Sequence, residues 1–254
     1  MKVKLEKKSQ RGFFFFMVTT ILAAFGIARN RHINSTVIFR QILFTGFEAL
    51  PIISFIALGI GGLIILQGYT LLSNFGQGVW IHVILVTVVV KELSSIITAL
   101  VVVARSGTAI STELGNMVVN REIDLLRSFG VSPISYLVLS RLIGVIIAMM
   151  ALTLYFNIVA VLGGWFFSNI FNRIEFRAFI NDFLGVLKFS DVFMSLIKPV
   201  VFGFLIAIIA SFQGMSVVKA STEVPQRTIK AVVQSLFLII VLDILITWAF
   251  WSIA

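Results

Sequence analysis

The stretch at residues 79–104, VWIHVILVTVVVKELSSIITALVVVA, decides the fold class. Almost all of its residues are apolar, as in a helix surrounded by hydrocarbon, yet Lys91 and Glu92 stand near its middle. Placing either charge alone in hydrocarbon costs roughly 2.5–3.5 kcal/mol on insertion scales. Such charges normally face a protein interior or a wet cavity, so the stretch raises the question of what these two charges meet.

The composition of the whole chain indicates an integral membrane protein. Hydrophobic residues make up 59% of its 254 residues and charged residues 12%, whereas a soluble globular chain has roughly 45–50% and about 25%. One core of a chain this long cannot hide that excess, because too little polar material remains to cover it. Lipid must therefore be part of the solvent.

Several classes of function are excluded or disfavoured by what the sequence lacks. The chain has no cysteine, which excludes disulfides, iron–sulfur clusters and thiol nucleophiles. It has only two histidines, His32 and His82, so a zinc site is improbable. No GxxxxGK[ST] motif occurs, so we expect no cofactor in this chain and, if ATP drives it, a nucleotide site on another subunit. The net charge of +9 does not indicate nucleic-acid binding, because the basic residues lie at the edges of apolar runs, as expected on the cytoplasmic side of a membrane.

Five apolar segments predict five membrane-spanning helices, and the glycines within them are expected to let helices pack closely. The segments are 47–72, 79–104, 137–168, 194–218 and 231–252, with a polar turn at 73–78 between the first two. Lys and Arg are frequent in the loops at 105–136 and 219–230, whereas the loop at 169–191 is charge-neutral. The positive-inside bias therefore places the loops at 105–136 and 219–230 in the cytoplasm and the C-terminus outside.

The apolar stretch at 13–28 has basic residues on both sides and is interpreted as a helix lying in the membrane interface. As a helix it would be about 24 Å long, short for a hydrocarbon core near 30 Å. The basic N-terminus falls on the cytoplasmic side only if this stretch does not cross. A first spanning helix and a secretory signal peptide remain as alternatives. The chain is thus divided into residues 1–44, the basic N-terminus and interfacial helix, and residues 45–254, the transmembrane domain.

The segment at 105–136 is predicted to hold a short charged helix between the second and third spans. Asn120 is expected to cap a helix that begins at Arg121, and Gly130 and Pro133 are expected to end it. Apolar side chains at three-residue spacing fall on one face of this helix: Ile123, Leu126 and Phe129. The helix is either a solvated element of a cytoplasmic loop or a docking surface for a soluble partner.

The run KELSSIITALVVVARSGTAISTELGNMVVNREIDLLRSFGVSPISYLVLSRL at 91–142 resembles the MlaE/YrbE family, the permease subunits of ABC transporters associated with MCE (mammalian cell entry) proteins. The matching motifs are LQGY at 66–69, ARSGTA at 104–109, ELGNM at 113–117, REIDLLRSFGVSP at 121–133, LIKPVVFG at 196–203 and FQG at 212–214. The resemblance covers about 45–254. It departs at Lys91, where many relatives have arginine; lysine keeps the charge but loses the planar bidentate fork.

The resemblance implies an all-α homodimer in the bacterial inner membrane, each copy with an interfacial N-terminal helix and five spanning helices. A cytoplasmic ABC ATPase, which binds ATP and Mg, is expected to dock on a coupling helix at about 120–130, so the chain itself is not an enzyme. A periplasmic hexamer of MCE subunits is expected above the membrane, and some systems add a STAS-domain protein. The implied cargo is phospholipid, moved between the inner and outer membranes to maintain outer-membrane lipid asymmetry.

The resemblance also implies roles for particular residues. Contacts to the ATPase are expected from Arg121, Glu122, Asp124, Arg127, Gly130 and Pro133. A lipid pocket is expected from Leu66, Tyr69, Lys91 and Glu92. On a helix Lys91 and Glu92 point about 100° apart, so they need not pair with each other. Two interpretations stay open: ion pairs to other spans, or a polar lining of a cavity that receives a lipid headgroup.

Two other classes of function remain. An autonomous secondary transporter or channel would use Glu92 or Asp243 as an ion site, and a non-transporting scaffold would only hold an assembly together. An intramembrane enzyme is disfavoured, because no Ser/His/Asp set or HExxH motif appears in the sequence.

Overall fold

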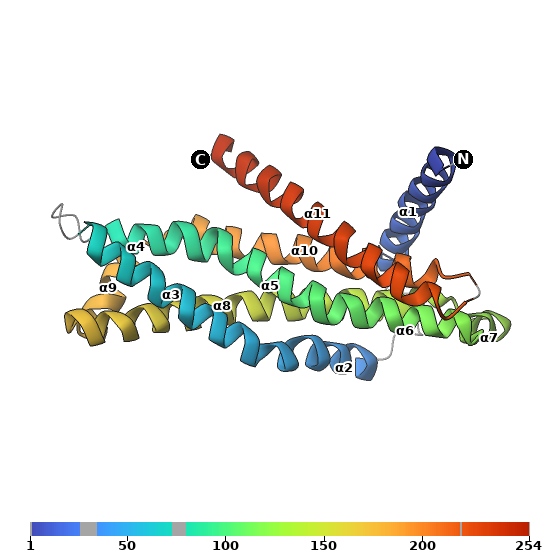
Figure 1. Cartoon of the computed structure of the whole chain (residues 1–254), viewed down its shortest axis with the longest axis horizontal. Coiled ribbons are helices and arrows are strands. Elements are labelled where there is room, and N and C mark those ends of the chain that lie inside the picture. Colours follow the sequence, from blue (N-terminus) through green and yellow to red (C-terminus); the bar gives the residue numbers. More distant parts are fainter. Residues whose placement is uncertain (1, 26–34, 73–79, 219, 254) are drawn as a thin grey trace. The chain divides into compact units, whose positions relative to one another are not determined.

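The computed structural model describes residues 2–25, 35–72, 80–218 and 220–253, which are helical almost throughout and contain no strand (Figure 1). The predicted polar turn at 73–78 and His32 lie outside the described residues. The prediction of an all-α membrane protein is confirmed.

The N-terminal region contains two helices, α1 (Lys2–Phe25) and α2 (Ser35–Gly46). The apolar part of α1 is Gly12–Ala23, shorter than the helix of about 20 residues that a bilayer core requires. The first helical segment long enough to cross a membrane joins α2 to the 3₁₀ turn η2 (Phe47–Ala49) and α3 (Leu50–Leu72). A shorter N-terminal apolar helix thus precedes the spans as expected, and its interfacial placement stays a prediction.

The described part of the chain after residue 79 holds the other four spans and two shorter helices between them. The second span consists of α4 (Trp80–Ile84), the π-helical η4 (Leu85–Leu93), α5 (Ser94–Val102), the π-helical η5 (Val103–Gly107) and α6 (Thr108–Val119). After it come α7 (Glu122–Ser128), the π-helical η6 (Ile134–Val138), α8 (Leu139–Asn172), α9 (Phe176–Val186), α10 (Phe189–Met215) and α11 (Glu223–Ile253).

Five helical segments among the described residues are long and apolar enough to cross a membrane, as predicted. They are Thr36–Thr70, Trp80–Val119, Ile134–Phe171, Phe189–Met215 and Glu223–Ser252. The second extends well beyond residue 104, where the sequence predicted a loop. Charges such as Arg105 and Glu113 end the hydrocarbon-like character of the sequence, but both residue types are favourable in helices, so the helix continues.

The chain divides into two compact units, each assembled from three separate stretches. Unit 1 consists of 1–45, 102–147 and 203–239, and unit 2 consists of 46–101, 148–202 and 240–254. Each unit is described by itself.

Close packing in unit 1 brings α6 against α10 at Gly214. A Cβ atom on Gly214 would lie 2.6 Å from the carbonyl oxygen of Ser111 and 2.9 Å from the Cβ of Leu114. Contacts this short leave no room for a side chain. The glycine of the FQG motif is therefore explained by the close approach of the two helices.

In unit 2, glycines likewise allow α3 and α8 to pack closely. A Cβ atom on Gly163 would lie 2.7 Å from the carbonyl oxygen of Leu58, and one on Gly61 would overlap the carbonyl group of Ala160. The expectation that glycines in the spans serve helix packing is confirmed for this pair of helices.

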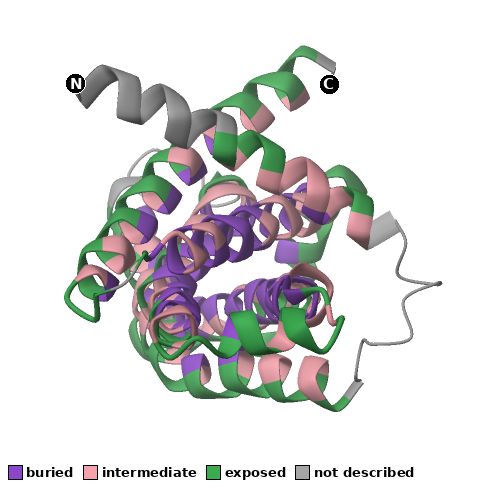
Figure 2. Ribbon diagram, turned by 90° about the vertical axis from the view of Figure 1, so that its right-hand side faces the viewer, coloured by how far each residue is buried: buried purple, intermediate pink, exposed green. Residues whose placement is uncertain are grey.

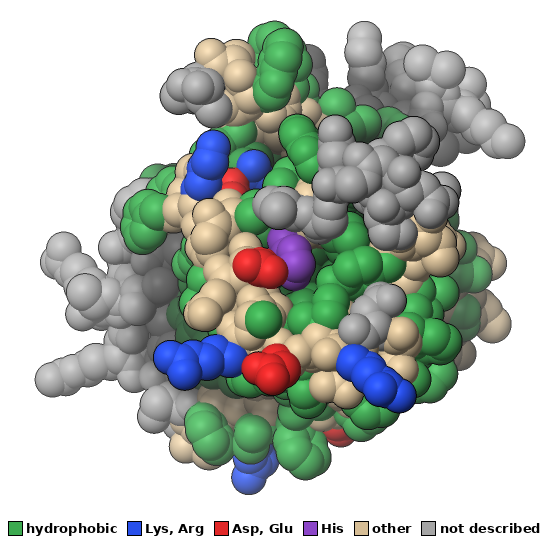
Figure 3. All heavy atoms as spheres, turned by 90° about the vertical axis from the view of Figure 1, so that its left-hand side faces the viewer, with side chains coloured by type: hydrophobic (Ala, Val, Ile, Leu, Met, Phe, Trp, Pro, Cys, Tyr) green, Lys and Arg blue, Asp and Glu red, His purple; other side chains and the backbone are tan. Residues whose placement is uncertain are grey.

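Along individual helices, buried residues alternate with exposed ones (Figure 2). Many of the exposed side chains on the spanning helices are large and apolar; Phe55 is 83% exposed and Trp251 82%. Such a surface suits contact with hydrocarbon. The face drawn in Figure 3 shows acidic and basic side chains among hydrophobic ones.

Candidate functional site

Lys91 and Glu92, the two charges within the apolar stretch at 79–104, lie in a π-helical part of the second span. Both residues belong to η4, and the Ser94 amide donates to the carbonyl of Val89, five residues back, rather than four. The Ser94 hydroxyl donates to the carbonyl of Val90 at 3.0 Å. Such local widening of an α-helix is frequent at functional sites.

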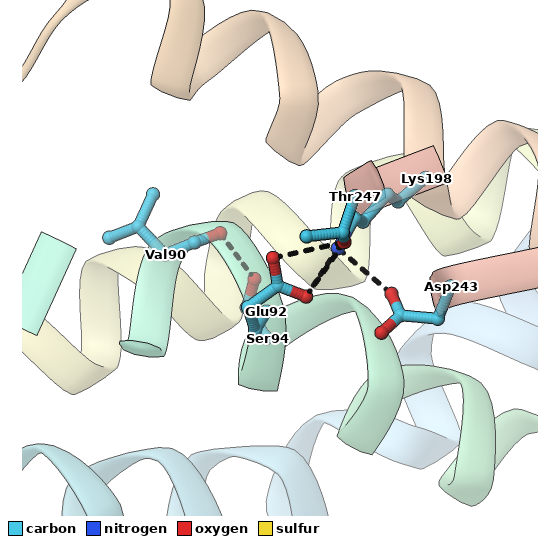
Figure 4. A network of polar contacts seen from close by, with 6 residues as sticks. All are labelled: Val90, Glu92, Ser94, Lys198, Asp243 and Thr247. Atoms are coloured by element: carbon cyan, nitrogen blue, oxygen red, sulfur yellow. Dashed lines mark hydrogen bonds and ion pairs between the residues drawn. The ribbon is translucent and has the colours of Figure 1, made fainter. Parts of the chain in front are cut away.

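Glu92 takes part in a polar network within unit 2 that is centred on Lys198 of α10 (Figure 4). The fully buried Lys198 ammonium donates to Glu92 Oε2 at 2.5 Å and to Thr247 Oγ1 at 2.8 Å. The Thr247 hydroxyl in turn donates to the Glu92 carboxylate, at 3.2 and 3.3 Å from its two oxygens. Three separate segments of unit 2 therefore meet at one ammonium group.

Asp243 of α11 is the last member of the network and forms an ion pair with Lys198 without a hydrogen bond. Its Oδ1 lies 2.9 Å from the Lys198 nitrogen, but this contact lacks hydrogen-bond geometry, and Oδ1 has no hydrogen-bond donor among the described residues. One ammonium group thus faces two carboxylates, of Glu92 and Asp243. Each carboxylate depends on Lys198 for neutralisation, so removing Lys198 would leave both uncompensated.

Lys91 pairs with a different acid, at the start of α10. Its ammonium lies 2.8 Å from Asp191 Oδ1. The backbone amide of Lys188 also donates to Asp191, at 3.1 Å from Oδ2. Lys91 and Glu92 thus pair with different residues of α10, in keeping with the expectation that these two neighbours need not pair with each other.

Both interpretations of the charge pair describe part of what is found. Glu92 and Lys91 are ion-paired to another span, and the same two residues border a cavity of about 220 Å³. The cavity lies wholly within unit 2 and is lined by Thr87, Lys91, Glu92, Ser190, Asp191, Met194, Thr247, Phe250 and Trp251. A second hollow of about 380 Å³ borders the same network, at Glu92, Asp243, Ile244, Thr247, Trp248 and Trp251.

Leu66 and Tyr69 are half-buried residues of α3. Neither is among the described residues that line the two hollows next to Glu92. The structure therefore brings Lys91 and Glu92 together at one cavity but does not add Leu66 and Tyr69 to it. The role of these four residues in lipid binding stays a prediction.

Sequence reasoning missed the central residue of the network. Lys198 appeared only as a letter in the LIKPVVFG motif, Asp191 only as part of a neutral loop, and Asp243 only as an ion site in a rival function. A signal was present, because Lys198 and Asp243 are charges inside apolar runs, just as Glu92 is. Charges of opposite sign in different spans are candidates for pairing with one another.

The short charged helix predicted between the second and third spans is present as α7, in unit 1, but its start differs from the prediction. Arg121 adopts a left-handed conformation (φ 60°, ψ 19°) that separates α6 from α7. No side chain caps the helix; the Asn120 amide instead donates to the Glu122 carboxylate at 3.4 Å. The predicted Asn120 cap is therefore wrong, because α6 runs up to that residue and leaves no extended cap position.

The end of α7 follows the prediction. Gly130 has a positive φ of 73°, which glycine adopts without strain. Its amide donates to the carbonyl of Arg127 at 3.0 Å, and the amide of Val131 donates to that of Leu126 at 3.0 Å. This pair of bonds is the Schellman arrangement that closes a helix. Pro133 follows as the residue before η6.

The apolar side chains of α7 do not all lie on one buried face. Ile123 is buried, but Leu125 is 54% and Phe129 76% exposed. The predicted common face of Ile123, Leu126 and Phe129 is therefore wrong for Phe129, since the helix ends at Ser128 and the chain turns there. Four charged residues are exposed beside these apolar ones: Arg121, Glu122, Asp124 and Arg127.

An ion pair ties α6 to α8 inside unit 1. The buried Arg141 places Nη2 2.8 Å from Glu113 Oε1 and donates from Nη1 to the carbonyl of Leu137 at 3.1 Å. Both ARSGTA–ELGNM and Arg141 belong to the block on which the family resemblance rests. Among the described residues no group of three or more His, Cys, Asp or Glu side chains is placed to hold a metal ion.

Comparison with known proteins supports the resemblance over most of the chain. The family model described as Permease MlaE matches residues 38–249. A probable ABC transporter permease protein of Rickettsia typhi is 34% identical over 212 residues, which is 84% of this chain and 82% of the relative. The intermembrane phospholipid transport system permease protein MlaE of Haemophilus influenzae is 26% identical over 209 residues, 82% of this chain and 80% of the relative. The chloroplastic protein TRIGALACTOSYLDIACYLGLYCEROL 1 of Arabidopsis thaliana is 32% identical over 162 residues, 64% of this chain and 46% of that protein.

Proposed function

Because this chain belongs to the MlaE permease family, a family of multi-pass ABC transporter permeases, we propose that it moves phospholipid between the inner and outer membranes of a bacterium and so maintains outer-membrane lipid asymmetry. The name of its Haemophilus influenzae relative supports phospholipid as the cargo. We place the chain in the inner membrane, as one half of a homodimer.

The observation that carries the proposal is the hollow beside the Lys198 network. A charged group is tolerated in a membrane span only where a partner or a wet cavity meets it, and Glu92 has both an ion-pair partner and a hollow beside it. Lipid sites need apolar walls for the chains and a few polar groups for the head. Phe250 and Trp251 supply apolar wall, and Lys91 and Glu92 supply charge. Leu66 and Tyr69 are proposed to meet the acyl chains as they enter.

The energy of ATP hydrolysis is proposed to reach this chain through α7. Its exposed Leu125 and Phe129, flanked by charges of both signs, form an amphipathic surface suited to a groove on a cytoplasmic ABC ATPase. Polar contacts there are assigned to Arg121, Glu122, Asp124 and Arg127, with the turn at Gly130 and Pro133 fixing the angle of the helix. ATP and Mg would be held by that partner and not by this chain.

The proposed mechanism is mechanical. Closure of the ATPase subunits pushes on α7, and the Arg141–Glu113 ion pair transmits the movement from α6 to the start of α8. Rigid-body movement of the spans then narrows the cavity and expels lipid toward a periplasmic hexamer of MCE subunits. A STAS-domain protein is a further proposed companion of the ATPase.

The test is ATP-dependent transfer of fluorescent phospholipid from vesicles that contain this chain and its ATPase. Reversing two charges with Glu122→Lys and Asp124→Lys is expected to abolish both ATPase co-purification and transfer. Full co-purification with unchanged transfer would remove α7 from the coupling role. For the cavity, Glu92→Gln and Tyr69→Ala are expected to lower the phospholipid recovered with the purified protein, as measured by mass spectrometry.

The rival functions make different predictions in the same assay. Transfer by the purified chain without any ATPase would indicate an autonomous transporter or channel. A scaffold predicts that changes at Glu92 leave lipid transfer intact, while changes in α7 still disrupt the complex.

A further inference from the structure

A larger cavity lies in unit 2, away from the charged network. It has a volume of about 400 Å³, is lined by α8, α9, η4 and the start of α10, and has an open side, where Ile158 is 60% and Leu184 57% exposed. Its walls are almost wholly apolar; Ile158 and Leu162 come from α8, Phe183 and Leu184 from α9, and Val90 from η4. A methylene group occupies roughly the volume of a water molecule, about 30 Å³, so the cavity has room for at least about a dozen methylenes. That is enough for one hydrocarbon chain.

The polar side chains of the cavity are Asn157 and Ser195. The Ser195 hydroxyl is already used, because it donates to the carbonyl of Val192 at 2.9 Å. Asn157 Oδ1, by contrast, is shielded from solvent and has no hydrogen-bond partner among the described residues. A buried amide oxygen without a donor is unfavourable, so a ligand that brings a donor to this point gains affinity.

The surroundings decide the kind of ligand. The lining residues of α8 and α10 belong to the membrane-spanning segments Ile134–Phe171 and Phe189–Met215, so hydrocarbon is the solvent beside them. Two of the residues that line the cavity are sequence neighbours of charged residues. Val90 and Val192 line it, and the next residues, Lys91 and Asp191, form the ion pair that borders the neighbouring hollow.

We propose that this cavity binds the single acyl chain of a monoacyl glycerophospholipid, with the free glycerol hydroxyl donating a hydrogen bond to Asn157 Oδ1. The single chain fits the volume, and the free hydroxyl supplies the donor that a diacyl phospholipid lacks at that position. This site deepens the proposed lipid-transport function and rests on it, because it adds a second lipid class to the same protein.

The experiment uses the full chain in nanodiscs and a monoacyl phosphatidylcholine that carries a photoreactive diazirine in its chain. After illumination, adducts are mapped by peptide mass spectrometry. We expect them to concentrate on residues 154–162 and 180–187. Unlabelled monoacyl lipid should compete, and its 2-deoxy analogue, which lacks the hydroxyl, should compete roughly 5- to 10-fold less well.

Variants sharpen the assignment. Asn157→Leu is expected to abolish the difference between the two competitors, and Leu162→Trp, which fills the cavity, to remove the adducts. Ile170→Trp is the matched control, because Ile170 is an exposed apolar residue of the same helix that is not among the residues lining the cavity. The competition between the two lipids is measured in the unchanged protein, so the proposal can still be overturned if a variant folds poorly.

Adducts spread evenly over lipid-facing positions such as Phe166 and Ile170, or equal competition by the deoxy analogue, would overturn the proposal and show ordinary boundary lipid. Labelling requires no ATP, and ATP-dependent transfer of diacyl phospholipid is measured separately. If diacyl phospholipid is transferred but the labelling is even, only the proposed monoacyl site is wrong. If the labelling is specific but no transfer occurs, the proposed transport function is wrong.

Discussion

The Lys198 ammonium lies 2.5 Å from the Glu92 carboxylate although the two residues are 106 positions apart in the chain. Lys198 is fully buried and also faces Asp243, so one lysine neutralises acids from two other segments of unit 2. Ion pairs in low dielectric are costly to break from one side, because the remaining charge stays buried and uncompensated. The network therefore joins three segments of unit 2 and holds the Glu92 carboxylate at the edge of the cavity.

Replacing that lysine should destabilise the protein strongly. Lys198→Met keeps most of the side-chain volume but leaves Glu92 and Asp243 unpaired, so we expect a loss of about 3–5 kcal/mol in the free energy of unfolding. Thermal or denaturant unfolding in detergent measures it. Lys230→Met is the control, because Lys230 is an exposed residue of α11, and should change stability little. Adding Glu92→Gln to Lys198→Met should recover part of the loss; no recovery would mean that the pair does not couple.

Helix packing in unit 2 offers a matched pair of glycines. Gly61→Ala would push a methyl group into the carbonyl of Ala160, whereas Gly59 has nothing within 4 Å of an added Cβ. We expect Gly61→Ala to cost about 1–3 kcal/mol by overpacking, and Gly59→Ala to be neutral or slightly stabilising, since alanine is the better helix former. Equal melting temperatures for the two variants would contradict the close approach of α3 and α8.

The end of α7 can be tested at Gly130, whose φ of 73° disfavours any residue with a Cβ. Gly130→Ala should cost about 1 kcal/mol and alter the direction in which the chain leaves the proposed coupling helix. We expect reduced ATPase binding as well as reduced stability. Gly185→Ala in α9, where an added Cβ meets nothing within 4 Å, should leave ATPase binding unchanged. Unaltered ATPase binding in Gly130→Ala would separate the turn from coupling.

His82 is buried, and neither ring nitrogen has a hydrogen-bond partner among the described residues. Its ring packs at 5.0 Å from that of Phe179 in α9. Because two polar atoms are buried without partners, His82→Leu should be neutral or stabilising by about 1 kcal/mol. Unfolding measurements decide it, with His82→Asn as the polar comparison, which is expected to be less stable than His82→Leu. A clear loss of stability in His82→Leu would indicate that the ring has a polar partner after all.

At α7 the local sequence pattern predicted the end of the helix correctly, but not its start. The glycine at position 130 ends the helix as the sequence required, since a positive φ there is a property of one residue. The Asn120 cap and the common apolar face failed because both assumed an isolated helix, whereas α6 continues to Val119 and the chain turns at Arg121. Helix propensity describes an isolated segment, whereas the start of a helix in the folded protein also depends on the elements that flank it.

The sequence by itself determined that this chain is helical and crosses a membrane with five segments, because apolar length and charge position are local properties that lipid reads directly. It also determined that Lys91 and Glu92 need partners, since hydrocarbon does not tolerate unpaired charge. Only the tertiary structure decided that Glu92 meets Lys198 while Lys91 meets Asp191. Which side chains meet depends on how distant helices pack, and spacing along one helix carries no information about the rotation of another.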